Sequence, residues 1–277
     1  MDILIIAQLT VQETQRRRIL WIALVLALAF LALFAIGFHY VYADAVSAGL
    51  NSENARLVIG VLLSAGLYAT NFLIIVISVI TSVTAVSGEI ESHTVETLLT
   101  KPMRRWELIL GKWLGFAAML VVYIVLLAGG IVLYVYWRTG FWVQNLLFGF
   151  SLMVLQGLLI LSLTIAGGTR LSSLANGVLA FMLYGLASLG GWVEQIGAML
   201  RNETAVNVGI VTSLIMPSEV LWKKALALFQ PQFSGSLMLA GPFSITSQPS
   251  NLMLIYALVY MLALLGIAMW SFTRRDL

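Results

Sequence analysis

Six long apolar stretches constrain this chain more than any other feature. They cover residues 19–41, 57–86, 108–136, 145–169, 171–193 and 252–272. About 20 helical residues cross the hydrocarbon core of a bilayer, and a backbone in lipid must satisfy its own hydrogen bonds. The alternating pattern of a membrane β-strand is missing. The stretches therefore predict an all-α integral membrane protein with six transmembrane helices.

The composition agrees with lipid as the main solvent of this chain. Hydrophobic residues make up 61% of the 277 positions and charged residues 10%, whereas soluble domains carry about 25% charge. The net charge of +3 gives no reason to expect a nucleic acid partner. The chain has no cysteine, which excludes disulfides, thiolate metal ligands and a cysteine nucleophile.

The basic residues predict the orientation. With six spans both termini lie on one side, and that side carries ten of the 15 basic residues. These ten are Arg16, Arg17, Arg18, Lys101, Arg104, Arg105, Lys112, Arg170, Arg274 and Arg275. The other side carries Arg56, Arg138, Arg201, Lys223 and Lys224. The positive-inside rule therefore places both termini in the cytoplasm.

The whole chain, residues 1–277, is expected to form one transmembrane domain. Residues 1–18 mix apolar and polar side chains and predict an interfacial helix before the first span. Residues 192–251 form the only long loop outside the cytoplasm, with short helices at 207–216 and from Pro217 onward. This loop is an outer gate, a platform for an extracytoplasmic partner or a lid, and the sequence does not separate these.

A charged segment interrupts the apolar pattern between the second and third spans. Residues 87–112 hold 8 of the chain's 27 charged side chains in 26 positions. A connection between two helices needs neither this length nor this charge density. We interpret the segment, with residues 87–107 as its core, as a docking site for a soluble partner. The alternative is a solvated loop whose charges anchor the topology.

This segment resembles the first cytoplasmic loop of ABC-2 type permeases, the membrane subunits of one class of ATP-binding-cassette transporters. The matching residues are Glu89, Glu91, Thr94, Glu96, Thr97, Leu98, Leu99, Pro102, Arg105, Gly111 and Lys112. The start of the chain, with Ile6-Ala7, Glu13 and Arg18, is also similar. Residues 216–225 (Met-Pro-Ser-Glu, then Trp-Lys-Lys-Ala) resemble the branch with the permease of the nitrous-oxide-reductase copper-maturation transporter.

The resemblance implies an ABC-2, type V exporter-like permease fold in the inner membrane of a bacterium or archaeon. It implies that the loop residues above couple the permease to two copies of a separate ATPase subunit, which binds ATP and Mg²⁺. This chain has no Walker A signature and is expected to hold no cofactor. A second permease copy in a homodimer, or a related permease in a heterodimer, is expected to complete the path. The complex would export a substrate or transmit ATP-driven motion to an extracytoplasmic partner.

The spans contain few polar side chains. Asn71, Gln156 and Asn176 are candidates for a substrate path, with hydrogen bonding between helices as the alternative role. No metal site is expected, because His39 and His93 fall on opposite sides of the membrane. No catalytic residue is expected either, because an intramembrane enzyme would need a nucleophile and a base at matching depth. A membrane anchor for an assembly, without transport, is a further alternative.

Overall fold

The computed structural model describes residues 3–16, 18–47, 52–88, 104–230 and 249–274. Within these ranges all regular secondary structure is helical. The helices are α1 (Ile3–Arg16), α2 (Arg18–Ser47), α3 (Ser52–Val83), α6 (Arg105–Thr139), α7 (Leu146–Gly168), α8 (Ser173–Met199), α9 (Glu203–Ile215), α10 (Ser218–Phe229) and α11 (Asn251–Thr273).

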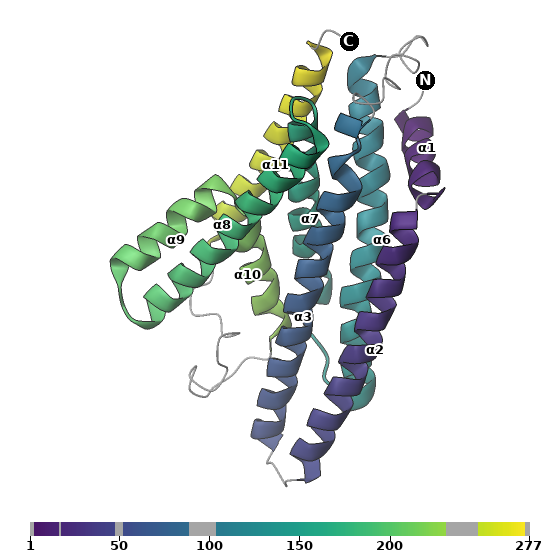
Figure 1. Ribbon diagram of the computed structural model, residues 1–277. Helices are drawn as coiled ribbons and strands as arrows, with labels where there is room; N and C mark the ends of the chain where they lie inside the picture. The colour runs from purple at the N-terminus through teal and green to yellow at the C-terminus, as the bar shows by residue number, and fades with distance from the viewer. Residues whose placement is uncertain (1–2, 17, 48–51, 89–103, 231–248, 275–277) are drawn as a thin grey trace.

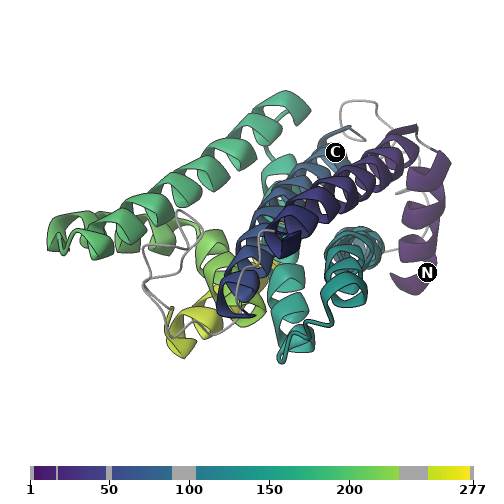
Figure 2. The same ribbon diagram turned by 90° about the horizontal axis from the view of Figure 1, so that it is seen from below.

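Six of these helices, namely α2, α3, α6, α7, α8 and α11, are long and apolar enough to cross a membrane. The prediction of an all-α protein with six spans is therefore confirmed. Both termini lie at the same end of the bundle (Figure 1), which we call the termini end. Helices α8 and α9 form a hairpin that leans away from the other spans, as the view along the bundle shows (Figure 2).

Local sequence explains several of the helix boundaries. Ser172 and Asn202 cap the starts of α8 and α9 by accepting hydrogen bonds from backbone amides three residues later. Gly140 ends α6 in a left-handed conformation with φ of 70°, which a residue without a Cβ adopts freely. These boundaries are set by residues that compete with or complete the helical hydrogen-bond pattern.

The region between the fifth and sixth spans is more helical than a loop. Helix α8 continues to Met199, six residues beyond the predicted end of the fifth span. Helices α9 and α10 then meet at a 108° bend around Pro217, so the pair is either a broken span or a re-entrant element. Helix α10 packs against α3, α7 and α8, and its Leu221 and Trp222 are buried in the main core.

Helix α7 lies at the centre of the bundle and contacts α3, α6, α8, α10 and α11. Helix α1 instead packs along the start of α6 at the edge of the bundle (Figure 1). A Cβ atom at Gly115 of α6 would lie only 2.8 Å from the Ala7 carbonyl oxygen and 2.9 Å from the Thr10 Cβ. Small residues allow such close approach of helices, so α6 receives α1 at a glycine-lined contact.

Candidate functional site

The charged segment predicted to bind an ATPase is described by the structure only at its two ends. Ser87 and Gly88 continue from α3, and Arg105 opens α6. The predicted coupling residues Glu89, Glu91, Thr94, Glu96, Thr97, Leu98, Leu99 and Pro102 lie outside the described residues. Their roles stay predictions, and the structure instead reports how the two ends of the segment are attached to the bundle.

The α6 end is attached to α3 through Lys112. This side chain is only 6% exposed, and its Nζ donates a hydrogen bond of 2.6 Å to the carbonyl oxygen of Ala85. Ala85 lies in the turn that follows α3, where carbonyl groups lack partners within the helix. A buried ammonium group needs such an acceptor, because an unpaired buried charge is very costly. Lys112 therefore joins the two ends of the charged segment.

Gly111, the neighbouring coupling candidate, faces α1. A Cβ atom at this position would lie 2.6 Å from the Ile6 Cβ. Gly111 and Lys112 thus contact helices of their own chain, α1 in one case and the end of α3 in the other. Arg105 lies at the first position of α6 and is half-buried. Of the described coupling candidates, Arg105 is the one that lies within residues 87–107.

The α3 end is attached to α7 and α8 by hydroxyl groups. The Ser87 hydroxyl lies 2.9 Å from the hydroxyl of Ser173 at the start of α8. One turn and a half earlier in α3, the hydroxyl of Ser82 contacts the hydroxyl of Thr164 in α7. Both contacts are between distant parts of the sequence, so they fix the end of α3 relative to two other spans.

Further polar contacts extend this connection to α8 and α11. The Asn176 side chain, which is buried, donates a 2.7 Å hydrogen bond from Nδ2 to the Thr164 carbonyl oxygen. Thr169 and Arg170, just after α7, both donate to the hydroxyl of Ser271 in α11, at 2.9 and 2.8 Å. We call the whole set the polar junction. It comprises Ser82, Ala85, Ser87, Lys112, Thr164, Thr169, Arg170, Ser173, Asn176 and Ser271.

The three substrate-path candidates do not meet at one place. Asn176 belongs to the polar junction. Gln156 lies deeper, because its neighbour Gly157 accepts a hydrogen bond from Ser78 of α3. Asn71, whose Nδ2 donates to the Tyr184 hydroxyl at 3.4 Å, is seven residues before Ser78, or about 10 Å along the helix. The candidates therefore lie at three successive depths of the bundle.

Two of these candidates keep unused hydrogen-bonding capacity. Among the described residues, both amide atoms of Gln156 and the Oδ1 of Asn71 are buried without a hydrogen-bond partner. Buried polar atoms in membrane helices normally find partners in neighbouring helices. Their placement fits either a substrate path or contacts that form in another conformation, and the role of these residues stays a prediction.

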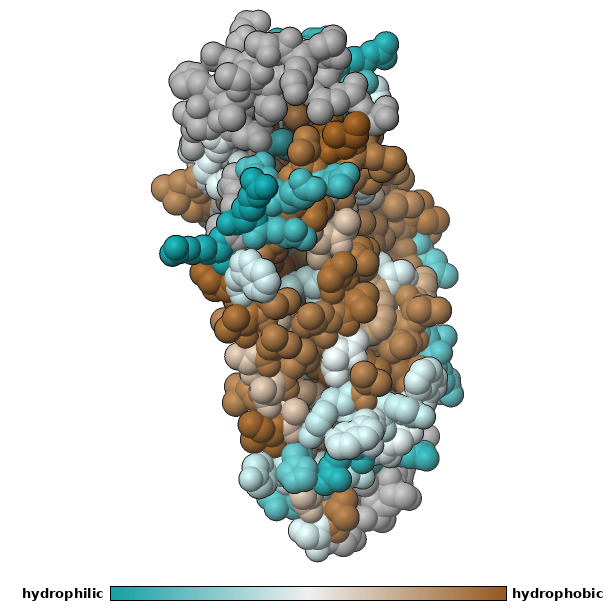
Figure 3. Space-filling view, turned by 90° about the vertical axis from the view of Figure 1, so that its right-hand side faces the viewer, coloured by the Kyte–Doolittle hydropathy of each residue, from teal (hydrophilic) through white to brown (hydrophobic). Residues whose placement is uncertain are grey.

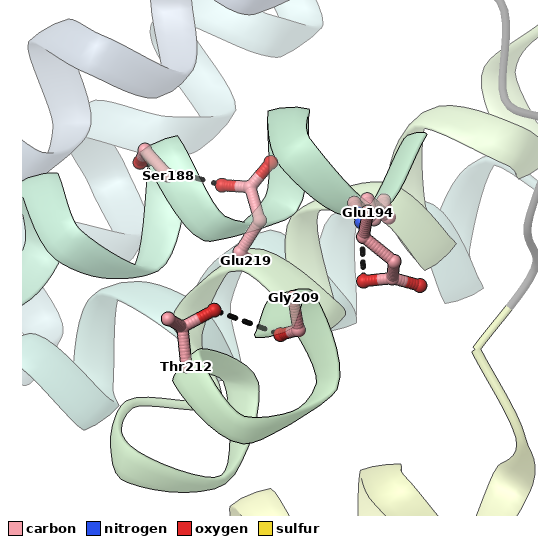
Figure 4. A network of polar contacts seen from close by, with 6 residues as sticks. Ser188, Glu194, Gly209, Thr212 and Glu219 are labelled. Carbon is pink, nitrogen blue, oxygen red and sulfur yellow. Dashed lines mark hydrogen bonds and ion pairs between the residues drawn. The ribbon is translucent and has the colours of Figure 1, made fainter. Parts of the chain in front are cut away.

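A second group of charges lies between α8 and α10 (Figure 4). The Lys223 Nζ forms a 2.8 Å ion pair with Oε2 of Glu194. The Ser188 hydroxyl donates to Glu219 at 3.4 Å, and the two side chains point toward each other. Lys223 and Glu219 are 4% and 3% exposed. We call these four residues the outer cluster; in it one ammonium group lies near two carboxyl groups.

The outer cluster is not among the sites that the sequence predicts. The predicted fifth span ends at Val193, one residue before Glu194, so this acid falls in the predicted loop. Lys223 enters the prediction only as one of the basic residues on the side opposite the termini. The signal that could have revealed the cluster is Glu194, an acid at the end of an apolar stretch. Acids in such stretches usually pair with another polar group.

The described residues contain no group of three or more His, Asp or Glu side chains placed to hold a metal ion. His39 lies in α2, and His93 is outside the described residues. Within that part of the chain, the polar junction and the outer cluster are groups of neighbouring hydrogen bonds and ion pairs between helices. Such sets position and link helices.

Comparison with known families identifies the class. A family model described as ABC-2 family transporter protein matches residues 4–277, so this chain belongs to that family. A search of curated proteins found no significant match. The chain is thus a multi-pass membrane permease subunit of an ATP-binding-cassette transporter, a class found in the inner membrane of prokaryotes. Family membership also implies an ATPase partner in general terms.

Proposed function

We propose that this chain is the membrane half of an ATP-driven exporter, in which residues 87–107 bind a separate ATPase subunit in the cytoplasm. The observation that carries the proposal is the polar junction. Both ends of the charged segment belong to the polar junction: Ser87 at the α3 end and Lys112 at the α6 end each form a hydrogen bond within it. A force applied to the segment would therefore act together on the five spans that the junction contains, namely α3, α6, α7, α8 and α11.

A rigid attachment is what a coupling element requires. If the segment moved freely, closure of the ATPase would displace only the loop. Hydrogen bonds of Lys112, Ser87 and Asn176 tie the segment's ends to α3, α6, α7 and α8. Displacement of the segment then reorients these helices together, which is the motion that alternating access needs.

Two copies of the ATPase and a second copy of this permease complete the proposed complex. ATP and Mg²⁺ bind to the ATPase, and this chain supplies the path. The outer cluster supports a role beyond the path, because the ion pair of Lys223 with Glu194 links α10 to α8. Through this link, reorientation of α8 would move α10 and an extracytoplasmic partner, or open an outer gate. Membership of the copper-maturation branch stays a prediction.

The decisive test uses the purified complex with its ATPase. Glu96→Arg combined with Leu98→Asp reverses a charge and removes an apolar contact in the coupling segment. We expect the co-purified ATPase to be lost, or its activity to fall to that of the isolated subunit. The matched control is Asp44→Arg, which reverses an exposed charge at the opposite end of α2 and should leave activity unchanged. Unchanged ATPase activity in the double variant would contradict the docking role.

A further inference from the structure

A groove opens on the side of the bundle where α1, α2, α3 and α6 meet. Its volume is about 570 Å³, within the range of about 300–1,000 Å³ for small-molecule sites. The lining side chains are mostly apolar and include Leu20, Ile77, Phe116, Ala118 and Leu126, with Gln15 among the few polar ones. It is separate from the polar junction and from the outer cluster.

We propose that this groove binds one acyl chain of an anionic phospholipid from the leaflet at the termini end. The first reason is its length. On α6 the lining runs from Phe116 to Leu126, which is about 15 Å of helix. One leaflet contributes half of a hydrocarbon core of about 30 Å. The groove is therefore as deep as one leaflet and starts near its surface.

The second reason is the charge at the mouth of the groove. Gln15 and Leu20 line the groove, and the exposed Arg16 and Arg18 lie between them in the sequence, where α1 meets α2. Arginine side chains bind phosphate groups with paired hydrogen bonds. Figure 3, which looks at this side of the molecule, shows a hydrophilic cluster directly above a broad hydrophobic surface.

One acidic and one buried basic residue also lie near the mouth of the groove. Glu13 lies on the exposed side of α1, one turn before Arg16, and partly offsets the positive charge. Lys112 of α6 is buried and bound to the Ala85 carbonyl oxygen. The two exposed arginines outnumber the single glutamate, so the mouth has a net positive charge. This charge favours an anionic lipid headgroup over a zwitterionic one.

The absence of cysteine from the sequence makes a direct test possible. Ala118 is exposed and lines the groove, so Ala118→Cys accepts a single fluorescent label there. The protein is reconstituted in vesicles that contain brominated phosphatidylglycerol or brominated phosphatidylcholine, and quenching is compared. We expect stronger quenching by the anionic lipid. The control is a label on Val125→Cys. Val125 is exposed on α6 outside the groove, so both lipids should quench this label equally.

Charge variants test the selectivity. Arg16→Gln with Arg18→Gln should reduce the preference for the anionic lipid by up to about five-fold for each arginine. Arg274→Gln is the control, because Arg274 lies at the termini end on α11 and contacts Trp270 instead of the groove. Equal quenching by both lipids at position 118, or an equal loss in the Arg274 variant, would overturn the proposal.

Filling the groove gives an independent measurement. Ala118→Trp should remove phosphatidylglycerol that co-purifies with the protein, as seen by native mass spectrometry, whereas Val125→Trp should retain it. Retention of the lipid in both variants would overturn the proposal. A label at position 118 that neither lipid quenches would do so too, because it would mean that protein covers the groove.

Discussion

At the scale of single residues, buried charges determine which helices are joined. Lys112 reaches the end of α3, and Lys223 reaches Glu194 of α8. Neither ammonium group is left in an apolar environment without an oxygen acceptor, which would be very costly. The two lysines lie in different parts of the bundle, one at the polar junction and one in the outer cluster. Their loss should have separable consequences.

Replacement of Lys112 by Met should destabilise the protein and weaken coupling. The change removes a charged hydrogen bond and leaves a buried carbonyl group, at a cost of about 1–3 kcal/mol. Thermal unfolding in detergent measures the first effect and ATPase activity of the complex the second. Arg138→Met, at an exposed position near the other end of α6, should change stability by less than about 0.5 kcal/mol. Equal effects of the two variants would show that the Lys112 contact is unimportant.

Replacement of Lys223 by Met should be more costly, because it removes the ammonium group that lies beside the buried carboxyl group of Glu219 and the partly buried carboxyl group of Glu194. Removing one partner of a buried ion pair typically costs about 3–5 kcal/mol. A second change, Glu194→Leu, should recover part of that loss, since it removes the carboxyl group whose ion-pair partner the first change deletes. Unfolding measurements on both single variants and the double variant form the test. Strictly additive effects would contradict a direct interaction.

At the scale of helices, two glycines of α6 allow α1 to pack closely against the bundle. Gly111 and Gly115 form the surface of α6 that contacts Ile6 and Thr10. With side chains at these positions the two helices could not approach as closely. Helix α1 also contributes Val11 and Gln15 to the groove, so its position affects the proposed lipid site as well.

Gly115→Leu should displace α1 from α6. The new side chain would meet the Ala7 carbonyl oxygen and Thr10 at less than 3 Å. Hydrogen exchange in α1 should become faster and the unfolding temperature should fall. Gly37→Leu is the matched control, because a Cβ there meets no atom within 4 Å. Similar exchange of α1 in the wild-type protein and the Gly115 variant would show that the contact is not selective for glycine.

At the scale of the whole molecule, the C-terminal ends of α2 and α6 lie at one end of the bundle and the termini at the other (Figure 1). The proposed orientation puts the termini in the cytoplasm. Asp44→Cys should therefore react with a membrane-impermeant thiol reagent in intact cells. Glu107→Cys should react only after the membrane is permeabilised. The reverse pattern would invert the orientation and place residues 87–107 away from a cytoplasmic ATPase.

The coupling segment shows how far the sequence predicts the candidate site. Its charge density and its resemblance to ABC-2 permeases identified it, and the family match supports the class of protein. The roles of Glu89, Glu96 and Leu98 stay predictions, since residues 89–103 are outside the described structure. The resemblance groups Gly111 and Lys112 with them, whereas packing places both against the protein's own helices.

The sequence by itself determined the number of spans, the helical class and the common side of the two termini. It could do so because transfer into lipid depends on each segment's own composition and on hydrogen bonds within that segment. Only the tertiary structure decided that Lys112 meets Ala85, that Lys223 meets Glu194 and that four helices enclose a groove. These contacts join residues from different helices, and hydropathy carries no information about which helix faces which.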